Sequence, residues 1–171
     1  MSALKRQFKN GNAWLFISFL IMAVLFYSSS QTMSRQTQIP RLERWLSNQP
    51  LNIQLSEIRF YYANVEISIE RLGYFHFIEF FIRKFAHFLS YFLLGVSLFN
   101  GLKNKYKRPI VLLAIISWLA STGYAGLDET HQMFTYSRSP LFEDVILNSV
   151  GAMTAIGLSL CNEGIKFLRK K

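Results

Sequence analysis

Four apolar stretches that are almost free of charged residues limit what this chain of 171 residues can fold into. They occupy residues 13–29, 85–102, 109–127 and 145–161. A helix that crosses the hydrocarbon core of a bilayer needs roughly 20 mainly apolar residues. Charged residues make up only 17% of the chain, against about 25% in soluble domains. We therefore predict a single all-α membrane domain with four transmembrane helices, of which the fourth has the weakest apolar pattern.

The distribution of Lys and Arg predicts how these helices are oriented. Eleven basic residues and one acid, Glu163, lie in the N-terminal tail, in the link after the second helix and in the C-terminal tail. The other segments carry eight basic and nine acidic residues. Because loops rich in Lys and Arg stay inside, both termini are predicted to be cytoplasmic. The net charge of +9 is thus explained by the short basic segments that orient the helices in the membrane. No nucleic-acid partner is predicted.

The first apolar stretch has one feature of a secretory signal, because Lys5, Arg6 and Lys9 precede it. Its apolar run is longer than the roughly 7–15 residues of such a signal, and no A-x-A cleavage pattern follows it. We therefore expect the first helix to be retained, with cleavage as the alternative.

Residues 30–84 are predicted to form a long extracytoplasmic segment. Residues 40–46 are typical of a short interfacial helix. Between residues 51 and 69 the apolar residues alternate, with a break at residues 63–64, and this pattern predicts a short β-hairpin. The Phe-rich residues 74–82 then follow a helical pattern that leads into the second transmembrane helix.

Polar residues gather at the predicted outer ends of the last three helices. Glu79, Arg83, His87 and Tyr91 recur every four residues, so they share one helix face, and Glu79 and Arg83 are within reach of an ion pair. Taken singly, such residues also have ordinary roles at a membrane boundary or a helix start. Charged groups near hydrocarbon usually pair and mark sites. We predict one functional polar cluster made of Arg83, Lys84, His87, Tyr91, Asp128, Glu129, Gln132, Arg138, Asp144 and Asn148.

Small residues on the last two helices predict close helix packing. Gly151 and Ala155 on the fourth helix, and Ser121 and Ala125 on the third, form small-xxx-small faces. If these faces meet, Asp128 and Asp144 approach each other; the alternative is that the small residues face lipid.

The same polar residues resemble the motifs of the VanZ-like family. The resemblance rests on RKFAHF at residues 83–88, DETHQ at residues 128–132, Arg138, and then Asp144, Asn148 and Gly151. It extends over about residues 13–158. The resemblance implies a small multi-pass protein of the bacterial plasma membrane. The founding member is linked to low-level resistance to the glycopeptide teicoplanin, and relatives to resistance to lipoglycopeptides.

We favour a protein that binds or modulates an envelope component, with a membrane lipid or a lipid-linked envelope molecule as its partner. Arg83, Lys84 and Arg138 would then contact phosphate or carboxylate groups.

The alternative is an intramembrane enzyme that modifies a lipid or a lipid-linked cell-wall precursor. His87 with Asp128 or Asp144 would be its acid–base pair or would hold a divalent metal. No Ser or Cys lies in an activating motif, so we lean away from an enzyme. We predict no cofactor and no resident metal. The lone Cys161 excludes internal disulfides and cysteine-built zinc sites.

A transporter is disfavoured. Transport sites generally lie near the bilayer midplane, often in proteins with internal repeats. In this chain the predicted charges lie at one membrane face, and no internal repeat is seen. A structural subunit of a larger complex remains a further alternative.

Overall fold

The computed structural model describes residues 3–134 and 140–169. Within them, four helices are long and apolar enough to cross a membrane, as predicted: α2 (Asn12–Ser29), α7 (Tyr74–Lys105), α8 (Ile110–Met133) and α9 (Phe142–Leu168). A short helix, α1 (Ala3–Lys9), precedes α2. Their outward faces carry large apolar side chains, among them Phe19, Phe85 and Leu119, which is typical of helices in lipid.

Three of these helices are longer than the charge-free stretches that predicted them. Helix α7 begins at Tyr74, α8 continues to Met133, and α9 begins at Phe142. The extra turns contain the charged and polar residues at which a charge-free stretch must stop. For α7 these turns include residues 74–82, whose helical pattern was predicted to lead into the second span, and the four predicted spans lie almost wholly within the four helices.

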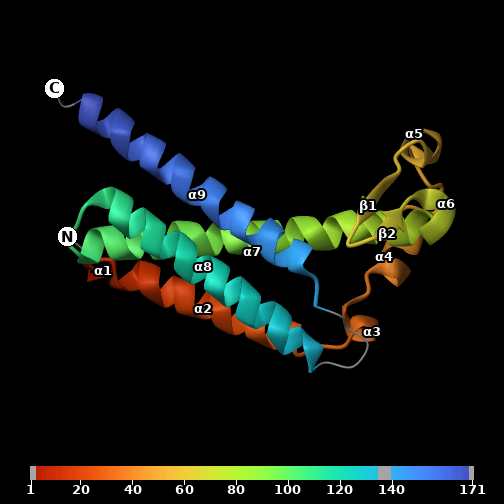
Figure 1. Cartoon of the computed structure of the whole chain (residues 1–171), viewed down its shortest axis with the longest axis horizontal. Helices are drawn as coiled ribbons and strands as arrows, with labels where there is room; N and C mark the ends of the chain where they lie inside the picture. Colours follow the sequence, from red (N-terminus) through yellow and green to blue (C-terminus); the bar gives the residue numbers. More distant parts are fainter. Residues whose placement is uncertain (1–2, 135–139, 170–171) are drawn as a thin grey trace.

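Helix α7 is the centre of the bundle and contacts α2, α8 and α9. Figure 1 shows the two termini and the α7–α8 link at one end of the bundle, here called the termini end. The end of α2, the end of α8 and the start of α9 lie at the opposite end, here called the loop end. This arrangement follows from four spans that alternate in direction. Two buried clusters hold the helices together: Leu25, Tyr91, Leu94 and Ala125 join α2, α7 and α8, and Phe99, Ala114 and Ile156 join α7, α8 and α9.

Helices α7 and α9 cross where each has a glycine, Gly95 and Gly151, so that their backbones come into close contact. A Cβ atom added to Gly95 would lie 2.8 Å from the Ala152 carbonyl oxygen, and one added to Gly151 would lie 2.6 Å from the Phe88 carbonyl oxygen. Gly151 therefore packs against α7, which corrects the expectation that it packs against the small residues of α8. Helix α9 meets α8 through Ser149, whose hydroxyl bonds Trp118 and Thr122. Ser121, Ala125 and Ala155 are fully buried.

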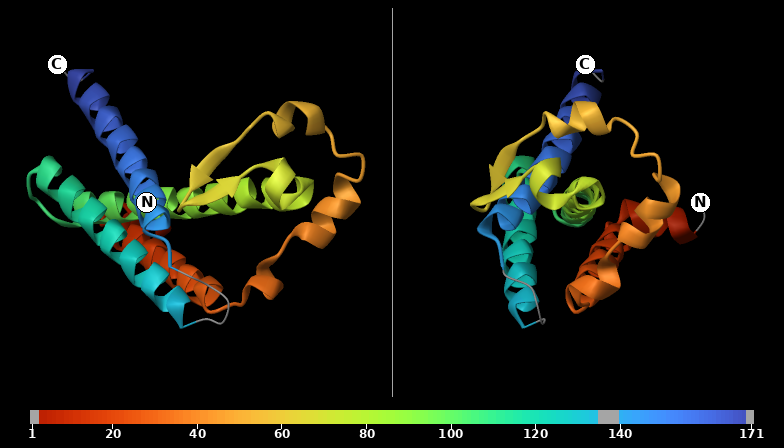
Figure 2. Two further views of the ribbon diagram at one scale, coloured as in Figure 1. Left: turned by 45° about the vertical axis from the view of Figure 1, so that its right-hand side comes forward. Right: turned by 90° about the vertical axis from the view of Figure 1, so that its right-hand side faces the viewer.

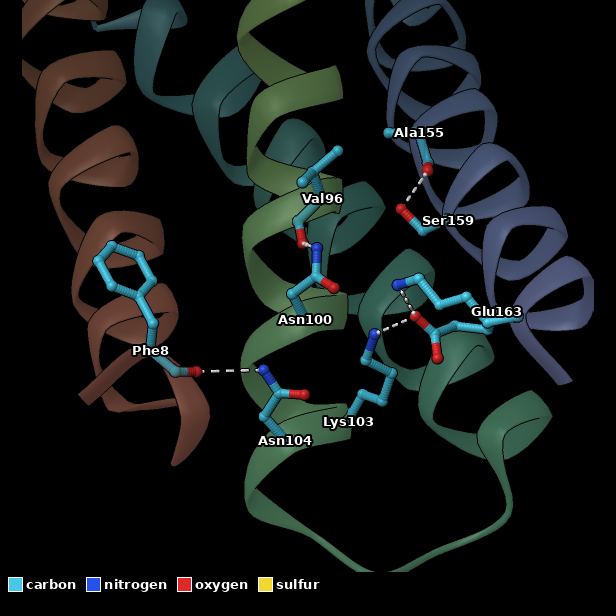
Figure 3. A network of polar contacts seen from close by, with 9 residues as sticks. Phe8, Val96, Asn100, Lys103, Asn104, Ala155, Ser159 and Glu163 are labelled. Atoms are coloured by element: carbon cyan, nitrogen blue, oxygen red, sulfur yellow. Dashed lines mark hydrogen bonds and ion pairs between the residues drawn. The ribbon is translucent and has the colours of Figure 1, made fainter. Parts of the chain in front are cut away.

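The termini end is closed by polar contacts between helices (Figure 3). The Glu163 carboxylate of α9 accepts hydrogen bonds from Lys103 of α7 and from Lys166, each at 2.9 Å. Asn104 donates to the backbone oxygen of Phe8 at 3.2 Å, which ties α1 to α7. These contacts attach the first and last helices to the central one.

Residues 30–73 form a chain of small elements that folds back against the start of α7 (Figure 2). They are α3 (Met33–Gln36), α4 (Ile39–Trp45), α5 (Asn52–Ser56), β1 (Phe60–Tyr62), β2 (Val65–Ile67) and α6 (Ile69–Leu72). The short helix predicted near residues 40–46 is confirmed by α4.

The predicted β-hairpin is present but shorter than the alternating pattern. Its strands pair antiparallel, with Tyr62 opposite Val65, around a turn whose two residues, Ala63 and Asn64, both have positive φ. Two such residues give the twist that a tight hairpin needs. Residues 52–56 are helical instead of extended. The alternating pattern alone does not produce a strand at residues 52–56. The turn at residues 63–64 sets the register of the hairpin, and in that register only residues 60–62 and 65–67 pair.

Candidate functional site

The polar side chains at the loop end form three connected groups, each held by more than one element. The first joins α7, α9 and the hairpin. Lys84 of α7 forms an ion pair with Asp144 of α9, with 2.5 Å between Nζ and Oδ1. The Tyr62 hydroxyl of β1 donates to the same carboxylate, and the Lys84 ammonium lies 4.4 Å from the centre of the Tyr62 ring. Asp144 thus accepts hydrogen bonds from β1 and from α7, two elements that are both far from α9 in the sequence.

This environment changes the chemistry of Tyr62. Burial raises the pKa of its phenol above the ordinary value, and the hydrogen bond to Asp144 and the charges of Asp144, Glu143 and Glu129 raise it further. The phenol therefore stays protonated and remains a hydrogen-bond donor to Asp144 over the physiological pH range.

The second group joins α8 to the start of α9. The Glu129 carboxylate accepts from the backbone N–H of Leu141 at 3.1 Å, and from the Gln132 side chain at 3.4 Å. Glu129 and Gln132 are both buried. A carboxylate that accepts a backbone N–H just before a helix begins also helps to fix where that helix begins.

The third group lies deeper and joins α8 to α2 and α7. Asp128 is only 3% exposed, and its carboxylate accepts hydrogen bonds from the Ser29 hydroxyl and, at 3.3 Å, from the Tyr91 hydroxyl. Hydroxyl donors stabilise a carboxylate in a position that water does not reach. Tyr91 is fully buried, as its place on the shared face of α7 requires.

Two further predicted residues have buried polar atoms that no described group satisfies. Asn148 is fully buried, and neither atom of its side-chain amide has a hydrogen-bond partner within the described ranges. The buried Nδ1 of His87 likewise has no hydrogen-bond partner among the described residues. Buried polar groups are nearly always paired, so such atoms mark a place for water or a ligand group.

Arg83 is not the base that pairs with the acids. It forms no ion pair or hydrogen bond with any residue in the part of the chain that the structure describes, and the predicted Glu79–Arg83 pair is not formed there. Glu79 instead accepts the backbone N–H of Gln38 at 2.5 Å. Arg83 lines a cavity of about 330 Å³ between α7 and the hairpin.

Two residues of this site, Ser29 and Tyr62, were not predicted from the sequence. Ser29 ends the first apolar stretch and has no motif, and Tyr62 lies in a segment whose pairing the sequence leaves open. Of the predicted residues, Arg138 lies outside the described ones. No group of three or more His, Cys, Asp or Glu side chains that could hold a metal ion occurs among residues 3–134 and 140–169.

Comparison with known proteins identifies the family. No curated protein and no solved structure matches the chain. The family described as VanZ/LLP1 matches residues 14–163, a range that contains the predicted polar cluster and nearly all of the four long helices. The chain is therefore a VanZ-like protein and belongs to the VanZ/LLP1 family.

Proposed function

We propose that this protein spans the bacterial plasma membrane four times, with both termini in the cytoplasm, and that its loop-end polar cluster binds or modulates an envelope component. By this proposal it contributes to resistance to glycopeptide or lipoglycopeptide antibiotics. Membership of the VanZ/LLP1 family and the four apolar helices support the membrane part of the proposal. The excess of Lys and Arg at the termini end supports the orientation.

One observation carries the functional part. Buried and partly buried charges from α7, α8 and α9 lie at the loop end, where Lys84 pairs with Asp144 and Glu129 accepts a hydrogen bond from the Leu141 backbone. Removing charges from water costs several kcal/mol each, by order of magnitude, unless they are paired, and packed apolar residues would hold helices together without that cost. A bundle that only had to be stable would not need this cluster. Charged residues at membrane depth are by default a site hypothesis.

The residue types suit an anionic or amide-bearing envelope group. Lys84 and Arg83 are cations of α7 at the loop end, and Arg offers a planar fork that matches phosphate and carboxylate groups. The acids Asp128, Glu129 and Asp144 fix the surrounding helices and accept hydrogen bonds. In this proposal the acids orient the site, and the bases contact the partner.

The test replaces single carboxylates by their neutral amides. Asp128→Asn and Asp144→Asn would be expressed in a susceptible bacterial strain, with Glu163→Gln at the termini end as the matched control. At equal membrane levels, we expect the two loop-end variants to lose most of the protection against teicoplanin that the unaltered chain confers, and the control to keep it. Unchanged susceptibility in both loop-end variants at equal levels contradicts the proposal.

A lipid-modifying enzyme is the second candidate, and one observation favours it. The buried Nδ1 of His87 has no hydrogen-bond partner among the described residues, so this nitrogen is available to exchange a proton with a bound molecule. Mass-resolved lipid profiles of a deletion strain and of a His87→Gln strain separate the two candidates. A lipid species lost in both strains favours the enzyme, and identical profiles favour binding.

A further inference from the structure

A cavity of about 330 Å³ lies between the start of α7 and the hairpin, within the range of roughly 300–1,000 Å³ found for small-molecule sites. Most of its wall is apolar. The hairpin supplies Val65 and Ile67, α6 supplies Leu72, and α7 supplies Phe80, with Leu141 closing the cavity beside α9. A wall of this kind suits a hydrocarbon chain better than a small polar solute.

The charged part of the wall consists of one acid, Glu79, and two bases, Arg83 and Lys84. Of the charged side chains that line the cavity, Glu79 accepts the Gln38 backbone N–H and Lys84 pairs with Asp144. Arg83 has no acidic partner among the described residues. The guanidinium of Arg83 is therefore free to bind an anionic group in the cavity, next to the ammonium of Lys84, which it would share with Asp144.

The position of the cavity along α7 suits a lipid headgroup. Arg83 and Lys84 directly precede Phe85, where the charge-free stretch of α7 begins. Phe81, Ile82 and Phe85 are exposed on the same part of the helix and offer apolar contact to surrounding acyl chains. Long basic side chains near the end of an apolar membrane-spanning stretch reach toward the interface, where lipid headgroups lie.

We infer that this cavity binds one molecule of an anionic lipid, with its phosphate on Arg83 and part of its acyl chain along the hairpin. This inference rests on the proposed function and names the class of envelope molecule. The shared chemistry is a phosphate, which a free phosphate ion also offers. The apolar hairpin wall distinguishes the two sources, because only the lipid gains from contact with it.

Binding to the purified full-length protein in detergent tests the inference. The probes are dioctanoyl phosphatidylglycerol, dioctanoyl phosphatidylcholine and inorganic phosphate. We expect one phosphatidylglycerol per chain and much weaker binding of the other two probes. Arg83→Gln removes charged hydrogen bonds to the phosphate and should weaken binding by about 10- to 100-fold. Arg44→Gln, an exposed arginine of α4, is the matched control and should change nothing.

A second pair of variants tests the apolar wall. Val65→Trp fills the cavity from the hairpin and Leu72→Trp fills it from α6, and neither changes a charge. Either variant should reduce phosphatidylglycerol binding at least as much as Arg83→Gln does. Because one substitution lies in the hairpin and the other in α6, misfolding of the hairpin alone would not explain a loss of lipid binding in both variants.

Three results would overturn the inference: equal affinity for the two lipids, equal effects of Arg83→Gln and Arg44→Gln, or inorganic phosphate that binds as tightly as phosphatidylglycerol. Failure here is separable from failure of the proposed function. If the cavity variants leave lipid binding unchanged while Asp128→Asn and Asp144→Asn still abolish antibiotic protection, only the lipid assignment is wrong.

Discussion

At the scale of single residues, the site depends on which of two adjacent bases meets the acids. Arg83 and Lys84 are neighbours on α7, and successive residues of a helix point about 100° apart. Lys84 therefore reaches Asp144 of α9, whereas Arg83 faces the cavity under the hairpin. Both bases and the acids were predicted from the sequence, and the four-residue spacing puts Glu79 within reach of Arg83, but Glu79 accepts the Gln38 backbone N–H instead. The choice depends on the rotation of α7 against α9, which spacing along one helix does not determine.

The Lys84–Asp144 pair is expected to contribute to stability. Its side chains are 19% and 13% exposed, so the pair is mostly but not fully removed from water. Loss of one partner of a fully buried pair costs about 3–5 kcal/mol, and for this partly exposed pair we expect about 2 kcal/mol for Lys84→Met. Denaturant unfolding in detergent measures the difference. The double variant Lys84→Met/Asp144→Asn should be destabilised by less than the sum of the single variants, and strict additivity contradicts a direct interaction.

Tyr62 is expected to make stability depend on pH in the alkaline range. Because burial and Asp144 raise its pKa above the unfolded value of about 10, the folded protein keeps a proton that the unfolded chain releases. Its contribution to stability is complete below pH 10 and is lost as the pH rises further. Unfolding measured from pH 8 to 11 should show a steeper loss above pH 10 in the unaltered chain than in Tyr62→Phe. Parallel curves for the two proteins would show that Tyr62 titrates normally.

At the scale of elements, the crossing of α7 and α9 brings the site together. Gly151 lies two turns beyond Asp144 on α9, and its contact with Phe88 holds Asp144 and Asn148 against the face of α7 that carries Lys84 and His87. The small-residue pattern predicted close packing correctly, because Gly151 and Ala155 are buried. It did not predict the partner helix, since small faces permit an approach from any neighbour that fits.

Two glycines of α9 offer a matched comparison. A Cβ at Gly151 would collide with the Phe88 backbone, whereas a Cβ at Gly157 meets nothing within 4 Å. We expect Gly151→Ala to destabilise the protein by about 1–3 kcal/mol through overpacking. Gly157→Ala should instead stabilise the helix by roughly 0.5–1 kcal/mol. Denaturant unfolding of both variants tests this, and equal effects would mean that the helix crossing does not limit stability.

At the scale of the whole molecule, the chain has two chemically different ends. The termini end carries most of the basic excess, with Glu163 held between Lys103 and Lys166 (Figure 3). The loop end carries the buried acids and the small elements of residues 30–73 (Figure 1). Four helices place these ends on opposite sides of the membrane. The positive-inside rule predicts, in line with the proposed orientation, that the termini end faces the cytoplasm.

The orientation is expected to be visible by labelling with a membrane-impermeant maleimide. Cys161 is exposed and would first be replaced by Ser. Asn48→Cys, in the segment at the loop end, should react in intact cells. Lys107→Cys, in the α7–α8 link, should react only after the membrane is permeabilised. The reverse pattern would invert the topology and place the polar cluster on the cytoplasmic side.

The sequence by itself determined the four apolar helices, the short helix and hairpin before α7, and the identity of most polar residues at the loop end. These features depend on local composition and periodicity, which neighbouring residues determine. Only the tertiary structure decided that Tyr62 meets Asp144, that Ser29 meets Asp128, and that Arg83 faces a cavity. Those contacts join residues about 80 to 100 positions apart or walls from several elements, and they exist only once the helices have packed with one particular rotation and crossing point.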